Sequence, residues 1–330
     1  MLNIKSRLVQ AEQVANPVKH IEDLQRIAGR QGEEKVVGLF TTIGGVHESD
    51  IFQALRVPDE FQTRRYEIDL VVLCGYGLYC VEIKNWGGQL KVCKDPTYWE
   101  QRKVLDSSKS RSTQIQYFNP VSETKKKAEV LRNHLMRAGI YLSENNVFTR
   151  VVLANESCDI DNRIQSDSCV VTPHKIEDFC SSFNRTLSDM LTDPFIPYFI
   201  RGQLSYSQMN QTRAALNQIG TWDILFLNGG KQLFGDLKGC TELSFNRKDI
   251  EEMNFSHNRN AIRASLLAVL GYVPTVTVRM FARGGAGWFT RATTASITVP
   301  YNLDISFRIA GETTDAKIPA NDIDKIMLSN

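Results

Sequence analysis

The sequence EIDLVVLCGYGLYCVEIKNWGG, residues 67–88, contains two apolar runs on either side of a glycine-rich turn. The runs cover residues 68–74 and 78–83, and a short turn between runs of this length is typical of a β-hairpin. Three charged residues, Asp69, Glu82 and Lys84, interrupt the apolar runs. An unpaired charge in a buried strand is costly. These three side chains are therefore expected to pair with one another or with a ligand.

Strand geometry predicts how the three charges can meet. Because side chains alternate between faces, Glu82 and Lys84 point the same way. A two-residue turn at 75–76 places Asp69 opposite Glu82, and one at 76–77 places it opposite Lys84; either turn brings all three charges to one face. A three-residue turn sets Asp69 opposite Ile83, and a β-bulge is then needed to rotate Asp69 back.

Two carboxylates and a lysine on one face favour phosphodiester hydrolysis. The carboxylates supply hard oxygen ligands for a divalent cation, and the ammonium can orient a water molecule or balance charge in the transition state. The alternative is a buried ion pair between Lys84 and one carboxylate, and the residues alone leave both interpretations open.

This arrangement of an Asp, a spacer and Glu-x-Lys on paired strands resembles the PD-(D/E)XK nuclease superfamily. The longer sequence, EIDLVVL followed by GLYCVEIKNWGG, is similar to the nuclease-related domain (NERD) branch of this superfamily. The resemblance covers about residues 27–183. It implies an α/β fold with a mixed sheet flanked by helices. It also implies a nuclease that uses Mg²⁺ or Mn²⁺, in which Asp69 and Glu82 bind the metal and Lys84 is catalytic.

A first helix, ending near residue 43, carries a further candidate ligand. Its apolar spacing places Glu33 on one face with Val37 and Phe40, so Glu33 is expected to point inward. The resemblance implies that Glu33, which follows Gly32, is the remaining acidic residue of the site. The alternative is an acid favoured at the start of a helix by the helix dipole.

Six further residues are candidates for substrate contact: Arg64, Arg65, Asn85, Trp86, Glu123 and Lys125. Asn85 and Trp86 follow the catalytic lysine and are expected to shape the floor of the site. Glu123 lies one turn into a helix that Asn119 and Pro120 start, at a position where the family usually has glutamine. Each basic candidate could instead be solvated, as is typical of a lysine run such as 125–127. The polar residues 101–116, with Lys103, Lys109 and Arg111, favour an exposed loop.

Composition narrows the class of protein. The 39 basic and 37 acidic residues give a net charge of only +2, so phosphate contacts must come from a local patch. Seven cysteines without a C-x-x-C pair indicate reduced thiols and an intracellular protein, cytoplasmic or nuclear. The sequence contains neither an apolar run long enough to span a membrane nor an apolar signal core, so no membrane partner is expected.

The pattern predicts three parts: residues 1–190 as the nuclease-like domain, 191–220 as a helical linker and 221–330 as a β-rich accessory domain. In the last part, Arg279, Arg283, Trp288 and Arg291 surround a glycine-rich turn and could contact a nucleic acid or a protein. The expected partner is nucleic acid, with DNA favoured over RNA; the accessory domain could bind a second copy of the chain or another protein. The alternative function is a catalytically silent nuclease fold that serves as a nucleic-acid-binding or protein-interaction scaffold.

Overall fold

The computed structural model describes the whole chain except residues 1–3, 107–110, 185–203, 241, 258, 260–269, 271–272, 285–292 and 330. Contacts divide the chain into two compact units. Leu24–Thr221 forms one unit, and Met1–Asp23 joins Trp222–Asn330 in the other. The predicted domain limits at residues 190 and 220 stay predictions.

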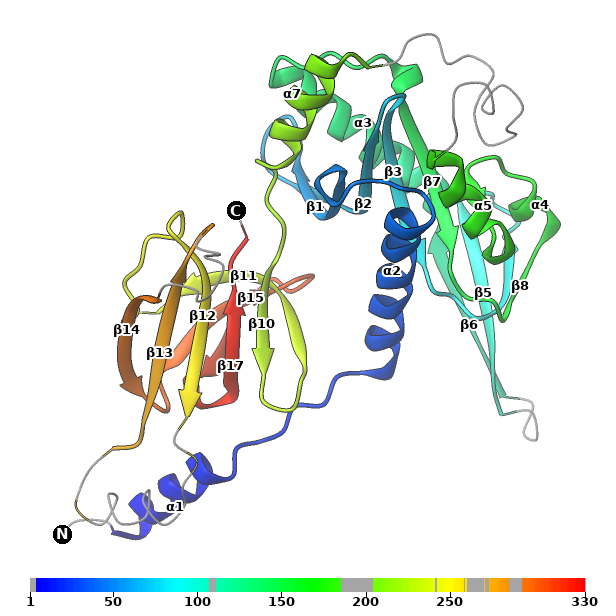
Figure 1. Cartoon of the computed structure of the whole chain (residues 1–330). Helices are drawn as coiled ribbons and strands as arrows, with labels where there is room; N and C mark the ends of the chain where they lie inside the picture. The colour runs from blue at the N-terminus through cyan, green and yellow to red at the C-terminus, as the bar shows by residue number, and fades with distance from the viewer. Residues whose placement is uncertain are drawn as a thin grey trace. The chain divides into compact units, whose positions relative to one another are not determined.

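A five-stranded mixed sheet organises the unit Leu24–Thr221, in the order β1-β2-β3-β7-β9 (Figure 1). Its strands are β1 (Ile51–Pro58), β2 (Arg65–Cys74), β3 (Gly77–Lys84), β7 (Val147–Leu153) and β9 (Val170–Val171). Neighbours among β1, β2 and β3 are antiparallel, whereas β7 runs parallel to β3 and β9 parallel to β7. The predicted α/β class with a mixed sheet is confirmed.

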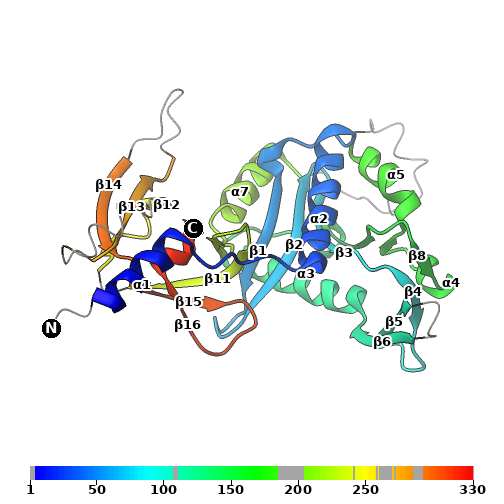
Figure 2. The ribbon, with the colours of Figure 1, turned by 90° about the horizontal axis from the view of Figure 1, so that it is seen from below.

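Helices cover both faces of this sheet (Figure 2). On one face, α3 (Pro120–Arg137) and α7 (Tyr206–Leu216) share an apolar cluster with Leu78 and Cys80 of β3. On the other face, α2 (Leu24–Thr42) and α5 (Ile176–Ser181) share a cluster with Tyr79 and Val81. Alternate residues of β3 therefore enter different cores, which is why the strand is apolar along most of its length.

The expected inward position of Glu33 on α2 is wrong. The buried residues of α2 are Gly32, Val36 and Phe40, and Glu33 is exposed. The reason is a close approach at Gly32, where a side chain would come within 3.3 Å of the Asn85 side chain at the end of β3. Because glycine permits this contact, the helix turns Gly32 rather than Glu33 toward the sheet.

A second sheet of four strands extends from the end of β3, in the order β6-β5-β4-β8. It comprises β4 (Gly88–Val92), β5 (Tyr98–Asp106), β6 (Arg111–Phe118) and β8 (Cys158–Ile160), and the short helix α4 (Asn162–Gln165) packs beside it. The predicted loop over 101–116 is therefore wrong, although Lys109 lies outside the described residues. Gln101 explains the error: it is only 1% exposed, and its amide donates to the Gly87 carbonyl at 2.7 Å. A buried glutamine satisfied by hydrogen bonds conceals the alternation of a strand.

The other unit contains helix α1 (Ile4–Ala15) and an eight-stranded sheet in the order β14-β13-β12-β17-β10-β11-β15-β16. The strands are β10 (Asp223–Leu227), β11 (Gln232–Gly239), β12 (Ile250–His257), β13 (Thr275–Ala282), β14 (Thr293–Pro300), β15 (Asp304–Ile309), β16 (Ala316–Pro319) and β17 (Ile323–Met327). Its neighbouring strands are antiparallel. The β-rich character predicted for this part is confirmed.

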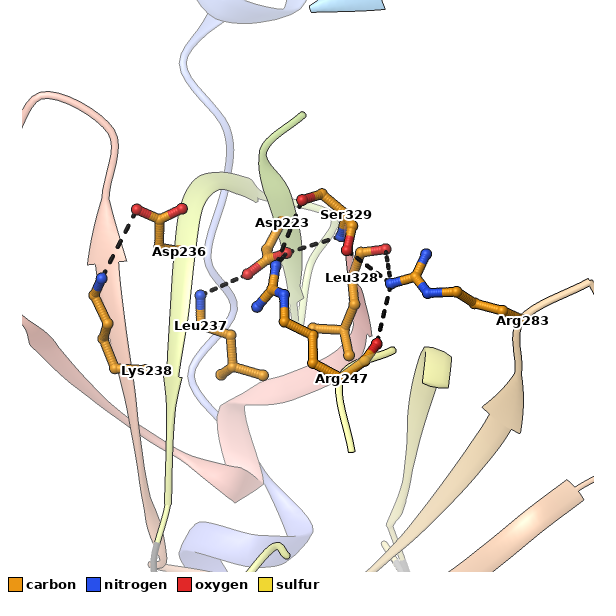
Figure 3. A network of polar contacts seen from close by, with 8 residues as sticks. All are labelled: Asp223, Asp236, Leu237, Lys238, Arg247, Arg283, Leu328 and Ser329. Carbon is orange, nitrogen blue, oxygen red and sulfur yellow. Dashed lines mark hydrogen bonds and ion pairs between the residues drawn. The ribbon is translucent and has the colours of Figure 1, made fainter. Parts of the chain in front are cut away.

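A buried carboxylate organises the polar interior of this unit (Figure 3). Asp223 is 0% exposed; it accepts hydrogen bonds from the backbone amides of Leu237 at 2.7 Å and Ser329 at 2.8 Å, and it pairs with Arg247. Arg283 donates to the carbonyl of Ser329 at 2.7 Å, and also to those of Arg247 and Leu328. These bonds tie β10, β11 and the chain end together.

The predicted basic surface around the glycine-rich turn is only partly described. Arg279 is exposed, Arg283 is engaged in the network around the chain end, and Trp288 and Arg291 lie outside the described residues. Arg283 therefore has a structural role that its sequence position did not indicate. All seven cysteines are free thiols. Among the described residues, no helix has the length and apolar character needed to cross a membrane.

Candidate active site

The hairpin of β2 and β3 fixes the first three site residues. Cys74 pairs with Gly77, so the turn consists of Gly75 and Tyr76, the first of the alternatives that the sequence left open. Gly77 has a φ of 146°, and a side chain there would lie 1.9 Å from the Asn146 carbonyl oxygen, so this position requires glycine. The register that starts at this turn brings Asp69 to the level of Glu82.

The two strands separate at the site itself. Their paired residues end at Leu70 and Val81, although β2 continues back to Arg65 and β3 continues to Lys84. Beyond that point the Ile83 amide donates to Asp69 Oδ2 at 2.8 Å. The carboxylate takes the place of the missing backbone partner, as a buried amide requires. Asp69 is thereby held in the opening between the strands.

Backbone strain accompanies this opening. Ala54 on β1 has a φ of 51°, one of two positive values among the described non-glycine residues. Its neighbours Gln53 and Leu55 pair with Leu70 and Ile68, so Ala54 lies beside Asp69 in the sheet. Left-handed backbone at a residue with a side chain is unfavourable and is often retained near functional groups.

Glu82 is the buried centre of the charge cluster. Its side chain is 5% exposed, and its two oxygens pair with two ammonium groups at 2.6 Å each, Oε1 with Lys84 and Oε2 with Lys127. Although burial acts in the opposite direction, the two lysines lower the pKa of Glu82. Burial likewise opposes the charge of Lys84, but Glu82 and Asp69 outweigh it and raise the pKa of Lys84. Glu82 therefore stays ionised between two cations.

The two remaining carboxyl groups hold their protons more tightly than usual. Burial, followed by the charge of Glu82, raises the pKa of Asp69 to about 6. Glu33 is exposed on one side, yet the partial loss of water around its carboxyl and the charges of Asp69 and Glu67 raise its pKa to about 7. The helix α2 packs on the opposite face of the sheet from α3, and Glu33 nevertheless belongs electrostatically to the same cluster. Carboxylates that repel one another in this way are candidates for cation binding.

The other sequence candidates are distributed unevenly around this cluster. Asn85 donates from its amide to the Ala28 carbonyl at 2.6 Å, so it holds α2 against the end of β3. Trp86 stacks on Tyr117 with ring centres 4.5 Å apart. Asn85 and Trp86 are the two residues that follow Lys84, and the Asn85 amide is engaged by a backbone carbonyl of α2.

The charged candidates lie on α3 and at the start of β2. Arg64 is exposed and lies 4.8 Å from the centre of the Tyr66 ring, and Arg65 is exposed at the first position of β2. Glu123 is exposed in the first turn of α3 and contributes to the raised pKa of Lys84. Lys125 is exposed and lines a separate cavity beside β7. Of these four residues, only Glu123 is among the charges that raise the pKa of Lys84.

Sequence reasoning missed Lys127 as a member of the site, because it stands in a run of three lysines. Its spacing on the helix carried a usable signal. Lys127 lies three residues after Thr124 and four before Leu131, both of which are 0% exposed. Positions at these spacings share one helix face, so Lys127 borders the buried stripe.

A divalent cation needs several oxygen ligands that converge on one point. Among the described residues, no three His, Cys, Asp or Glu side chains converge closely enough to hold a metal ion as they stand. The chemistry of the cluster nevertheless fits a hard cation, because Asp69, Glu82 and Glu33 offer carboxylate oxygens and the first and last of them have raised pKa values. Divalent charge between these groups would relieve their mutual repulsion.

Comparison with known proteins identifies the segment that carries the site. A search of curated proteins and a search of solved structures found no match. The family model of the nuclease-related domain matches residues 28–154, which include the hairpin, Glu33 and α3. The match starts within one residue of the start of the sequence resemblance and ends one residue after β7, before β9 and α5. The chain therefore carries a nuclease-related domain over residues 28–154.

Proposed function

We propose that the nuclease-related domain is a divalent-metal-dependent nuclease that hydrolyses phosphodiester bonds, with DNA favoured over RNA as substrate. The observation that carries this proposal is the meeting of Asp69, Glu82 and Lys84 where β2 and β3 separate. Two carboxylates and an ammonium at the open end of a strand pair are suited to phosphate chemistry, because they combine cation binding with charge stabilisation.

Asp69 and Glu82 are the proposed ligands of Mg²⁺ or Mn²⁺, and Glu33 is a further ligand. When bound, the cation supplies a Lewis acid for the scissile phosphate and lowers the pKa of the attacking water. The Ile83 amide keeps the Asp69 carboxylate in place, and the buried position of Glu82 limits its rotation. Such restraints reduce the reorganisation needed during the reaction.

Lys84 provides positive charge at the reacting phosphate. Its side chain is 26% exposed, and its ammonium lies 2.6 Å from Glu82 Oε1, at the proposed cation site. It orients the attacking water and stabilises the negative charge that develops on the phosphate oxygens. Burial of the remaining cluster strengthens this electrostatic effect.

The substrate approaches from the flank that Tyr66 marks. Arg64 lies 4.8 Å and Lys126 lies 5.6 Å from the Tyr66 ring centre, and both cations are exposed. Cations beside an aromatic ring can contact backbone phosphates and a stacked base. We assign Asn85 to the support of α2 instead of direct substrate contact.

The proposal is tested by cleavage of single- and double-stranded DNA and RNA in Mg²⁺ or Mn²⁺. Asp69→Asn and Glu82→Gln are expected to abolish cleavage, and Lys84→Met is expected to reduce it by roughly a hundredfold or more. Glu129→Gln, at an exposed position of α3, is the matched control. Cleavage that survives all three site changes would assign the activity elsewhere in the chain.

A second candidate function is a nucleic-acid-binding or protein-interaction scaffold without catalysis. It is favoured by Glu82, whose charge is already balanced by Lys84 and Lys127 at 2.6 Å each without any metal. The two functions differ in Mn²⁺ binding: a catalytic site binds the ion and loses it in Asp69→Asn, whereas a structural ion pair binds none. The unit that contains Trp222–Asn330 is the proposed surface for a protein partner or a second copy, to be examined by light scattering.

A further inference from the structure

Glu82 is held by two lysines that come from different parts of the domain. Lys84 lies two residues further along the same strand, whereas Lys127 reaches Glu82 from α3. Lys127 Nζ lies 2.6 Å from Oε2, and its side chain is 18% exposed. Both carboxylate oxygens of Glu82 are therefore paired with ammonium groups in this structure.

The three consecutive lysines of α3 have different surroundings. Lys125 is exposed and lines a cavity of about 760 Å³ with residues of β7. Lys126 is exposed and lies over the Tyr66 ring. Only Lys127, among these three, borders the buried stripe of the helix and pairs with the carboxylate of the site.

A divalent cation on Glu82 and the Lys127 ammonium would repel each other. Both would lie against the same carboxylate in a partly buried site, where water screens charges poorly. Lysine has a flexible stem of four carbons, so its ammonium can leave one partner and reach another nearby. The phosphate of a bound substrate is the anion that such a displaced ammonium would meet.

We propose that Lys127 is an internal counter-ion that competes with the divalent cation for Glu82 and contacts substrate phosphate once the cation has displaced it. This inference rests on the proposed metal-dependent nuclease. In this proposal, Lys127 holds Glu82 in the metal-free protein, and it binds substrate phosphate in the protein that carries the cation. No bond is made or broken by the exchange.

The inference is tested by calorimetric titration of the full chain with Mn²⁺ in the absence of nucleic acid. Lys127→Met is expected to bind Mn²⁺ about tenfold more tightly than the wild type, because the competing charge is gone. Lys127→Arg keeps the charge and is expected to keep the weaker affinity. Lys125→Met, the matched control, removes an equal charge outside the pair and is expected to stay within about twofold of the wild type.

Separate measurement of KM and kcat provides a second test. Loss of a phosphate contact is expected to raise KM about tenfold in Lys127→Met, with a smaller change in kcat, because the lost interaction is made with bound substrate as well as with the transition state. A purely structural lysine would not separate the two constants in this way while Mn²⁺ affinity increases.

The outcomes separate this inference from the proposed function. If the wild type binds Mn²⁺, Asp69→Asn does not, and Lys127→Met has unchanged affinity, the counter-ion role is wrong and the metal site stands. If neither wild type nor Lys127→Met binds Mn²⁺, the metal-dependent function itself fails. Should Lys127→Met not fold, nitrogen-detected NMR of the wild-type lysine side chains decides: Mg²⁺ must shift the Lys127 ammonium signal, and an unmoved signal overturns the inference.

Discussion

Two buried carboxylates, Glu82 and Asp223, differ in the groups that hydrogen-bond to them. Asp223 is 0% exposed and accepts two backbone amides in addition to Arg247. Glu82 is 4% exposed and is paired with two lysine ammonium groups. Backbone amides are fixed by the sheet, and a guanidinium holds a defined geometry, whereas an ammonium on a flexible stem can exchange partners.

The charges around the two carboxylates also differ. Beside Glu82, the raised pKa values of Asp69 and Glu33 show that negative charge is crowded and incompletely compensated. Beside Asp223, the donors come from β11, the chain end and Arg247, and each is part of a hydrogen-bonded network. A buried ion pair alone does not indicate function, and the repulsive cluster around Glu82 is what makes that carboxylate the candidate for cation binding.

The largest expected effect separates the two carboxylates by stability. Asp223→Asn replaces an acceptor of backbone amides with a group that can also donate, and it removes the negative charge that pairs with Arg247. We expect it to lower the free energy of unfolding by roughly 3–5 kcal/mol. Glu82→Gln is expected to cost about 1–2 kcal/mol, because Lys84 and Lys127 can turn toward water. Urea unfolding measures both.

Equal losses of stability in these two variants would contradict the distinction between fixed and exchangeable partners. The matched control is Glu129→Gln on the exposed side of α3, which is expected to change stability by less than about 0.5 kcal/mol.

Removal of the Lys84 ammonium, to which we assign a role in the proposed reaction, is expected to have the next largest effect. Lys84→Met is expected to reduce kcat by roughly a hundredfold or more, because the charge that stabilises the transition state is lost. The melting temperature should change little, since Lys127 still pairs with Glu82. Asp223→Asn should show the reverse: reduced stability, with kcat of the folded fraction retained. Single-turnover cleavage and thermal unfolding of the same samples test the contrast, which fails if Lys84→Met loses stability and activity together.

The raised pKa values predict how stability depends on pH. Asp69 titrates at about 6 in the folded state against 3.8 normally, and Glu33 at about 7 against 4.5. At these two groups the folded protein binds protons more tightly than the unfolded chain, so their contribution to stability should fall as pH rises from about 4 to about 7. The lowered pKa of Glu82 acts in the opposite direction, at the acidic end of this range. Because Glu33 is exposed, Asp69 is expected to account for the larger part.

Mg²⁺ should reverse this loss. Metal binding to deprotonated carboxylates strengthens with pH, so the rise in melting temperature on adding Mg²⁺ is expected at pH 7.5 and not at pH 5. Asp69→Asn should flatten the pH dependence and remove the Mg²⁺ effect. A Mg²⁺ effect that persists in this variant would place the cation elsewhere.

The sequence predicted the hairpin and its charges because both depend on short-range patterns. The runs around residues 75–77 and the alternation of Glu82 and Lys84 required no distant information. The sequence leaves the choice among turn registers open, because turns of two and three residues suit the same glycines. The structure selects the turn at Gly75 and Tyr76.

The remaining errors arose from contacts between distant segments. The exposed position of Glu33 follows from the packing of Gly32 against Asn85. These two residues are 53 positions apart in the sequence. The hairpin over 101–116 was missed because Gln101 is buried through hydrogen bonds to Gly87 and Tyr117. The contact of Lys127 with Glu82 joins residues 45 positions apart, and a run of three lysines does not reveal it. The spacing of Lys127 from Thr124 and Leu131 shows only that it borders the buried face of the helix.

The smallest expected effect concerns backbone strain. Among the described residues, such strain at residues other than glycine occurs in only one of the two units. Both positive-φ residues other than glycine among the described residues, Ala54 at 51° and Gln62 at 54°, belong to the unit with Glu82. Glycine tolerates this conformation, so Ala54→Gly and Gln62→Gly are each expected to change stability by no more than about 1 kcal/mol, in the stabilising direction. Urea unfolding measures the change.

Activity distinguishes these two glycine variants. Ala54 lies beside Asp69 in the sheet, whereas Gln62 lies in the exposed turn before β2. If the strain at Ala54 positions Asp69 between the separating strands, Ala54→Gly should lower kcat severalfold while Gln62→Gly leaves it unchanged, because added backbone freedom spoils the alignment of the carboxylate. Unchanged activity in both variants would mean that the Ile83 amide alone is sufficient to hold Asp69.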